Sequence, residues 1–221
     1  MISRLVQIPA SPSGSISLEG MLELPDNATG VVLFAHGSGS SRLSPRNNYV
    51  ARMLREAGLG TLLIDLLTQD EDTDYATRFD IPLLTQRLLA ATRWLQSEPS
   101  TPSLAIGYFG ASTGAAAALQ AAAEEGKKIA AVVSRGGRPD LAGEEGLNRV
   151  AAPTLLIVGG FDDMVISLNQ AAHRSLRCEK ELIVIPGATH LFEEPGTLEQ
   201  VAKHAANWFG KFMPRSGAES R

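Results

Sequence analysis

The sequence has 221 residues, of which 44% are hydrophobic and 20% charged, and its formal net charge is -4. A chain of this length can form one domain that buries a core without metal or disulfide staples. The acidic balance, with no run rich in Lys and Arg, argues against a nucleic-acid-binding protein, and no stretch approaches the roughly 20 apolar residues of a membrane span.

Along the chain, short apolar runs alternate with segments of helical spacing. Alternating residues in 18–24 indicate one or two antiparallel edge strands at the N-terminus. Strands are predicted at 31–35, 62–64, 104–109, 129–133, 155–158 and 182–185, and the run 31–35 is typical of a strand buried on both faces. Helices are predicted at 47–57, 81–95, 113–125 and 198–212. This alternation predicts an α/β fold: a mostly parallel central sheet with helices on both faces.

The length of the chain, without an internal repeat or a long linker, indicates one domain. Residues 1–212 are expected to form a single domain, and the polar segment 213–221 a flexible tail. The connection 134–153 has room for a loop or a small helix, so no large cap domain is expected over the site.

The strongest local motif is Gly110-Ala111-Ser112-Thr113-Gly114, which lies between a predicted strand and an Ala-rich predicted helix. This G-x-S-x-G pattern is typical of a nucleophile elbow, a strand-to-helix turn so tight that it needs glycine on both sides of the serine. The turn would present the Ser112 hydroxyl at a helix N-terminus, where backbone N–H groups stabilise negative charge. The alternative is a glycine-rich turn with an incidental serine.

A serine nucleophile needs a base and an acid, and the elbow pattern orders them as Ser, Asp or Glu, then His. His190 follows the last predicted strand, whereas His36 opens a different loop and His173 and His204 fall inside predicted helices. The acid is expected at Asp162 or its neighbour at 163, which follow the strand 155–158. The carboxyl ends of parallel strands share one edge of a sheet, so these residues should gather there.

The oxyanion of an ester-cleaving site needs two backbone N–H donors. The residue after the nucleophile, Thr113, should supply one, and the loop after the strand 31–35 the other, with Ser38 as the candidate. The same Gly/Ser loop lacks the spacing of nucleotide-binding motifs. Because the chain also has no Cys/His cluster, neither a metal nor a cofactor is expected.

Four motifs in order resemble the α/β-hydrolase superfamily: His36-Gly37 after a strand, the elbow at Ser112, Gly160-x-Asp162-x-x-Val165, and Gly187-x-x-His190. The arrangement is most similar to dienelactone-hydrolase-like proteins, and the resemblance covers about residues 30–212. It implies that Asp162 is the acid. True dienelactone hydrolases carry cysteine in the elbow, where this chain has Ser112, so the resemblance implies a general ester hydrolase.

The expected function is therefore hydrolysis of small carboxylic esters through an acyl-enzyme on Ser112. Two other functions use the same pattern: a thioesterase or acyltransferase, and a non-catalytic ligand-binding protein of the same fold. Arg42 and Arg135 follow predicted strands and are candidates for binding an anionic substrate. The alternative for these arginines is a set of surface ion pairs with Asp140 or Glu144.

Localisation is expected to be cytoplasmic, with a small-molecule ester as partner. The first 14 residues lack the apolar core of a signal peptide. Cys178 is the sole cysteine, so no intrachain disulfide can form, which fits a reducing compartment.

Overall fold

The computed structural model describes residues 1–11 and 13–213. Eight strands form one sheet with the spatial order β1-β2-β4-β3-β5-β6-β7-β8. Their bounds are β1 Ile2–Pro9, β2 Ser17–Leu24, β3 Gly30–Ala35, β4 Gly60–Ile64, β5 Ala105–Ala111, β6 Ile129–Arg135, β7 Thr154–Gly159 and β8 Lys180–Ile185.

The sheet is antiparallel at one end and parallel over the rest. β1 pairs with β2, and β2 with β4, in antiparallel fashion, whereas the pairs from β4 to β8 are all parallel. This confirms the predicted antiparallel strands at the N-terminus. The six strands predicted from 31–35 to 182–185 are all present as β3 to β8, and β3, β4 and β7 are buried along their whole length. β8 forms the other edge of the sheet and is largely half-buried or exposed.

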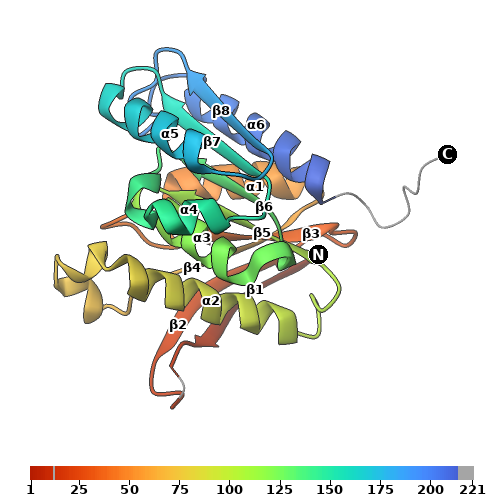
Figure 1. The fold of residues 1–221 in the computed structure, drawn as a ribbon. Helices are drawn as coiled ribbons and strands as arrows, with labels where there is room; N and C mark the ends of the chain where they lie inside the picture. The colour runs from red at the N-terminus through yellow and green to blue at the C-terminus, as the bar shows by residue number, and fades with distance from the viewer. Residues whose placement is uncertain (12, 214–221) are drawn as a thin grey trace.

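Helices cover both faces of this sheet, as predicted (Figure 1). Their bounds are α1 Pro45–Glu56, α2 Ile81–Ser97, α3 Thr113–Glu125, α4 Glu144–Arg149, α5 Asp163–Ser175 and α6 Thr197–Phe212. Short 3₁₀ helices lie at Glu71–Thr73, Thr77–Phe79, Gly126–Lys128 and Pro139–Ala142. The connection 134–153 thus holds only a 3₁₀ turn and the six-residue α4, and no cap domain is present among the described residues.

Two clusters of buried side chains fill the space between the sheet and the two helical layers. One joins the sheet to residues of α2, α3, α4 and α5, and the other joins it to α1 and α6. Each fully buried Val, Leu, Ile, Phe or Met side chain in them contributes roughly 1.5–3 kcal/mol. The sheet is therefore held from both sides, and its carboxyl edge is a rigid base for the loops that follow it.

Met213 departs from the predicted boundary of the tail. Its side chain is 1% exposed and packs in the cluster of α1 and α6, close to Gly30 and Gly107. The expectation of a flexible tail from residue 213 is therefore wrong at that residue, because a long apolar side chain fills the space that two glycines leave. The rest of the predicted tail, 214–221, lies outside the described residues.

Helix starts follow the local sequence. The Ser44 side chain accepts a hydrogen bond from the Asn47 N–H at the start of α1, which begins two residues before the predicted 47. The Asp80 side chain caps α2 in the same way. None of the described helices is long and apolar enough to cross a membrane.

Candidate active site

Ser112 lies at the turn between β5 and α3, in a backbone conformation that side-chain-bearing residues rarely adopt. Its φ is 51° and its ψ is -121°. A backbone in this conformation costs about 1–3 kcal/mol of stability, which contacts in the surrounding structure must offset. A Cβ at Gly110 would lie 2.4 Å from the Cα of Ala115, and a Cβ at Gly114 would lie 2.2 Å from the carbonyl oxygen of Ala35. The elbow therefore needs both glycines, as the motif predicts.

The loop that carries His190 starts from the edge strand β8 and crosses back over the sheet. It passes over the end of β7, where a Cβ at Gly159 would lie 2.5 Å from the Ala188 carbonyl oxygen. It then reaches the end of β6, where a Cβ at Gly136 would lie 3.2 Å from the His190 carbonyl oxygen. Since β6 is the neighbour of β5, this route brings His190 to the strand next to that of Ser112.

His190 is hydrogen-bonded to Asp162. The distance from His190 Nδ1 to Asp162 Oδ2 is 2.6 Å. Asp162 is the residue before α5, and its side chain makes no cap to that helix because it points to the imidazole instead. Asp163 is the first residue of α5 and is exposed. No hydrogen bond joins the Ser112 hydroxyl to His190 among the described residues; such catalytic bonds often tighten only when substrate binds.

The loop after β8 is held by contacts that sequence analysis did not identify. Phe192 is 2% exposed and has a φ of 55°, so it anchors the loop in the core through a strained backbone. The Thr189 N–H and hydroxyl donate to the Glu194 carboxylate at 3.0 and 2.6 Å, and these bonds lower the pKa of Glu194. No sequence motif marks these residues; only their closeness to His190 singles them out.

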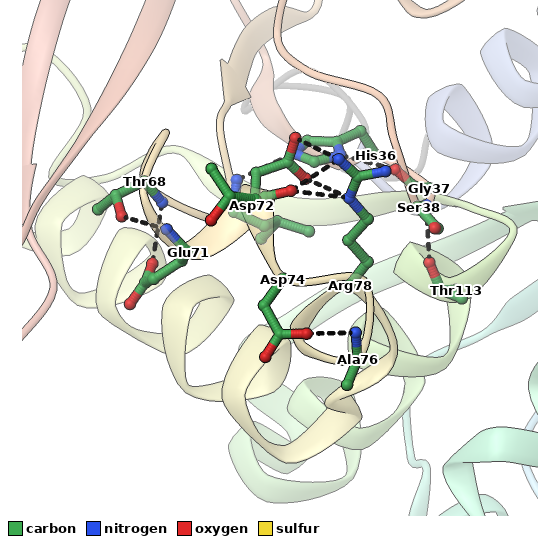
Figure 2. Close-up of polar contacts among 12 residues, drawn as sticks. His36, Gly37, Ser38, Thr68, Glu71, Asp72, Asp74, Ala76, Arg78 and Thr113 are labelled. Carbon is green, nitrogen blue, oxygen red and sulfur yellow. Dashed lines mark hydrogen bonds and ion pairs between the residues drawn. The ribbon is translucent and has the colours of Figure 1, made fainter.

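The two proposed oxyanion donors lie next to each other. The Ser38 N–H donates to the Thr113 hydroxyl oxygen at 3.0 Å, across 75 positions of sequence (Figure 2). A Cβ at Gly37 would lie 2.9 Å from the Ser112 Cβ, so this loop passes close to the nucleophile. An oxyanion would have to compete with the Thr113 hydroxyl for the Ser38 N–H.

The segment between β4 and α2 lies against this loop. Arg78 donates to the backbone oxygen of Asp72 at 2.6 and 3.0 Å and is ion-paired with the same residue's carboxylate (Figure 2). Arg78, Asp72, Ser38 and Thr113 are among the residues that line a cavity of about 10 Å³. That volume is close to the least that holds one water molecule.

His36 has a structural place in this region. It is 7% exposed, its Nε2 accepts the Leu66 N–H at 2.9 Å, and its Nδ1 lies 2.9 Å from the Gly37 carbonyl oxygen. These partners require the neutral ring with the proton on Nδ1. Burial lowers the pKa of His36, which favours the same neutral form. The ring ties the end of β3 to the end of β4.

The two candidate arginines differ in their surroundings. Arg42 forms ion pairs with Asp65 and Glu19, and its backbone N–H donates to Asp65 at 2.6 Å. The guanidinium of Arg42 is therefore engaged in ion pairs, as in the alternative interpretation, but its partners are not Asp140 or Glu144. The carboxylate of Asp140 is bonded instead to Arg138, at 2.9 and 2.7 Å.

Arg135 is 8% exposed, and its Nε and Nη1 have no hydrogen-bond partner in residues 1–11 and 13–213. Burial, reinforced by the charge of Arg46, lowers the pKa of Arg135 to about 10. The side chain therefore remains charged at neutral pH. Within the same described ranges, no group of three His, Cys, Asp or Glu side chains is placed to hold a metal ion.

Residues 18–213 match the dienelactone hydrolase family. The chain belongs to this family. A dienelactone hydrolase from Anabaena variabilis is 56% identical, with a TM-score of 0.91 over 96% of this chain and 98% of that one. Est1E from Butyrivibrio proteoclasticus is 18% identical, with a TM-score of 0.79 over 95% of this chain and 98% of that one, and shares the fold. The resemblance inferred from the sequence is thereby confirmed, and so is the α/β-hydrolase fold.

Two Mycobacterium tuberculosis proteins, from strains H37Rv and CDC 1551, carry the provisional name phosphoribosyl transferase. Each is 58% identical over 204 residues, which are 92% of this chain but 45% of the relative. The chain therefore spans a little under half the length of these curated relatives. Family membership supports a hydrolase.

Proposed function

We propose that this chain is a serine hydrolase that cleaves small carboxylic esters, with Ser112 as nucleophile, His190 as base and Asp162 as acid. The observation that carries the proposal is the 2.6 Å bond between Asp162 and His190. That pair is delivered to the end of β6, beside the strained elbow of Ser112. A histidine oriented by a carboxylate next to an elbow serine is the arrangement that activates a hydroxyl.

In the proposed reaction, His190 takes the Ser112 proton while the hydroxyl oxygen attacks the ester carbonyl. Asp162 accepts a hydrogen bond from the His190 Nδ1–H, which keeps the neutral ring protonated at Nδ1, and it stabilises the imidazolium. The N–H groups of Thr113 and Ser38 donate to the oxyanion. The imidazolium then protonates the leaving alcohol. Water, deprotonated by His190, releases the acid and restores the serine.

Apolar side chains beside the acid and the base favour substrates with a small apolar group. Phe161 is 73% exposed, Met164 66% and Leu191 40%. A substrate that covers them gains free energy from the buried area. Thioester hydrolysis and acyl transfer to an alcohol use the same residues and are the alternative reactions. A non-catalytic binding protein is the alternative in a different class.

The name of the mycobacterial relatives suggests another activity, phosphoribosyl transfer. It describes whole proteins of which this chain spans under half. This chain carries the serine elbow and the Asp162–His190 pair, so we assign hydrolysis, and not the transferase activity, to it.

A fluorophosphonate probe tests the proposal directly, because it reacts with activated serines. We expect a single labelled peptide that contains Ser112, no labelling of Ser112→Ala, and slow labelling of His190→Ala. Ser134, which is buried one strand away, provides a matched control: Ser134→Ala should be labelled like the wild type. A folded wild-type protein that is not labelled would favour the binding-protein alternative.

A further inference from the structure

Arg135 carries a positive charge that no described residue neutralises. Arg42, Arg46 and Arg138 each form an ion pair with a carboxylate. Arg135 is more deeply buried than any of these three, and its Nε and Nη1 have no partner in the described part of the chain. A buried cation without a partner destabilises a fold, whereas the same cation is stabilised when an anion binds it.

The position of this charge connects it to the nucleophile. The Ser112 N–H donates to the Arg135 carbonyl oxygen at 3.3 Å, so the two residues are neighbours across β5 and β6. An extended Arg side chain is roughly as long as two residues of extended backbone, about 7 Å, so the Arg135 guanidinium lies within about that distance of the backbone beside Ser112.

A second guanidinium lies near the first. The positive charge of Arg46, in the first turn of α1, contributes to the lowered pKa of Arg135. Arg46 also contacts the loop that carries His190, whose carbonyl oxygen would lie 3.2 Å from a Cβ at Gly136, the residue after Arg135. Its Nη1 is 2.9 Å from the carboxylate of Glu193, in the loop that carries His190, and its Nε is buried without a partner among the described residues. The Glu193 side chain is 62% exposed, so this ion pair is weak and a bound anion can replace it.

We propose that Arg135 and Arg46 form a subsite for a phosphate monoester group on the substrate, placed beside the nucleophile. This assignment of a substrate class rests on the proposed hydrolase function. Two guanidiniums supply two positive charges and three buried donor nitrogens that lack partners among the described residues: Nε and Nη1 of Arg135 and Nε of Arg46. A phosphate monoester offers nearly two negative charges and three acceptor oxygens, whereas a carboxylate offers one charge and two oxygens.

The binding site is tested without turnover, in the full chain with Ser112→Ala. Inorganic phosphate and acetate are titrated, and binding is followed by calorimetry and by the rise of the melting temperature. We expect phosphate to bind at least about tenfold more tightly than acetate. Adding Arg135→Met should weaken phosphate binding at least about tenfold, the effect of losing hydrogen bonds to a charged group. Arg138→Gln, which removes a paired arginine nearby, should leave it unchanged.

Misfolding is distinguishable from loss of the site. Arg135→Met removes an unpaired buried charge, so its melting temperature without anions should equal or exceed that of the parent. Phosphate binding that survives Arg135→Met overturns the subsite. Acetate binding as tight as phosphate binding overturns the assignment to phosphate esters.

The substrate class is tested in the active protein with paired esters that share an acyl group and differ in a phosphate on the alcohol. We expect Arg135→Met to lower kcat/KM for the phosphorylated ester at least about tenfold more than for the neutral one. Equal losses for both esters overturn the substrate role. Failure of the proposed hydrolase function would show differently, as no turnover of either ester alongside intact phosphate binding.

Discussion

Asp162→Asn replaces the carboxylate next to His190 with an amide of the same size. In the proposed mechanism His190 becomes positively charged, and the Asp162 carboxylate attracts that charge. With Nδ1 and Oδ2 2.6 Å apart, the charge centres lie roughly 4 Å apart. Their attraction is about 4 kcal/mol at an effective dielectric constant of about 20 and about 1 kcal/mol in bulk water.

The real value lies between these limits because the two side chains are partly exposed, His190 by 40% and Asp162 by 16%. About 2–3 kcal/mol corresponds to a loss of roughly 30- to 150-fold in rate. The amide N–H can also donate to Nδ1 and so stabilise the wrong ring tautomer. With that effect, the loss of kcat in such substitutions reaches about 10⁴-fold. We therefore expect kcat to fall roughly 10²- to 10⁴-fold.

The assay is turnover of a chromogenic acetate ester, with circular dichroism to establish folding. Asp163→Asn is the matched control, because it makes the same charge change at the adjacent, exposed residue. It should retain most of the wild-type kcat. The reasoning would be refuted if Asp162→Asn kept more than a third of kcat, or if both variants lost activity equally.

Two further predictions concern stability. Gly110→Ala would place a Cβ 2.4 Å from the Cα of Ala115, so we expect a loss of about 2–3 kcal/mol or more in the free energy of unfolding by urea. Gly146→Ala in α4 is the control, because its Cβ would lie 3.9 Å from the nearest atom, and it should change the free energy of unfolding by no more than about 1 kcal/mol. Equal losses in the two variants would contradict the role of the tight turn. Because burial lowers the pKa of His36, the unfolded state takes up a proton below about pH 6.5 that the folded state does not, so stability falls as the pH drops. Between pH 7 and pH 5 the melting temperature of the wild type should fall more than that of His36→Gln. Parallel plots of melting temperature against pH for the two proteins would count against this linkage.

The inner parallel strands were predictable because they are buried on both faces and therefore appear as unbroken apolar runs. The elbow was predictable from its G-x-S-x-G motif, although only Gly110 is required by contacts within a few residues and Gly114 is required by the approach of Ala35. Strand order was not predictable: β4 lies between β2 and β3, and no local pattern encodes that arrangement. The sequence therefore predicts where the inner strands lie along the chain but not which strands pair with each other.

The partners of charged side chains were also beyond sequence analysis. Arg46 is bonded to Glu193, 147 positions away, and Arg42 to Asp65 and Glu19, which are brought together by the antiparallel pairing of β2 and β4. Met213 was assigned to a polar tail because its neighbours are polar, yet the cavity it fills is made by glycines more than 100 positions earlier. Such contacts depend on tertiary structure, which periodicity does not report.

The loop that carries the proposed base follows an edge strand of the sheet. β8 has one neighbour and exposed positions along much of its length, whereas the elbow serine ends a central strand with neighbours on both sides. Local opening costs least where few contacts are lost. Fraying of this edge would carry His190 away while the elbow stays folded, so catalytic competence and global stability become separate properties: the protein can lose its activity to a small, reversible excursion long before its core begins to melt.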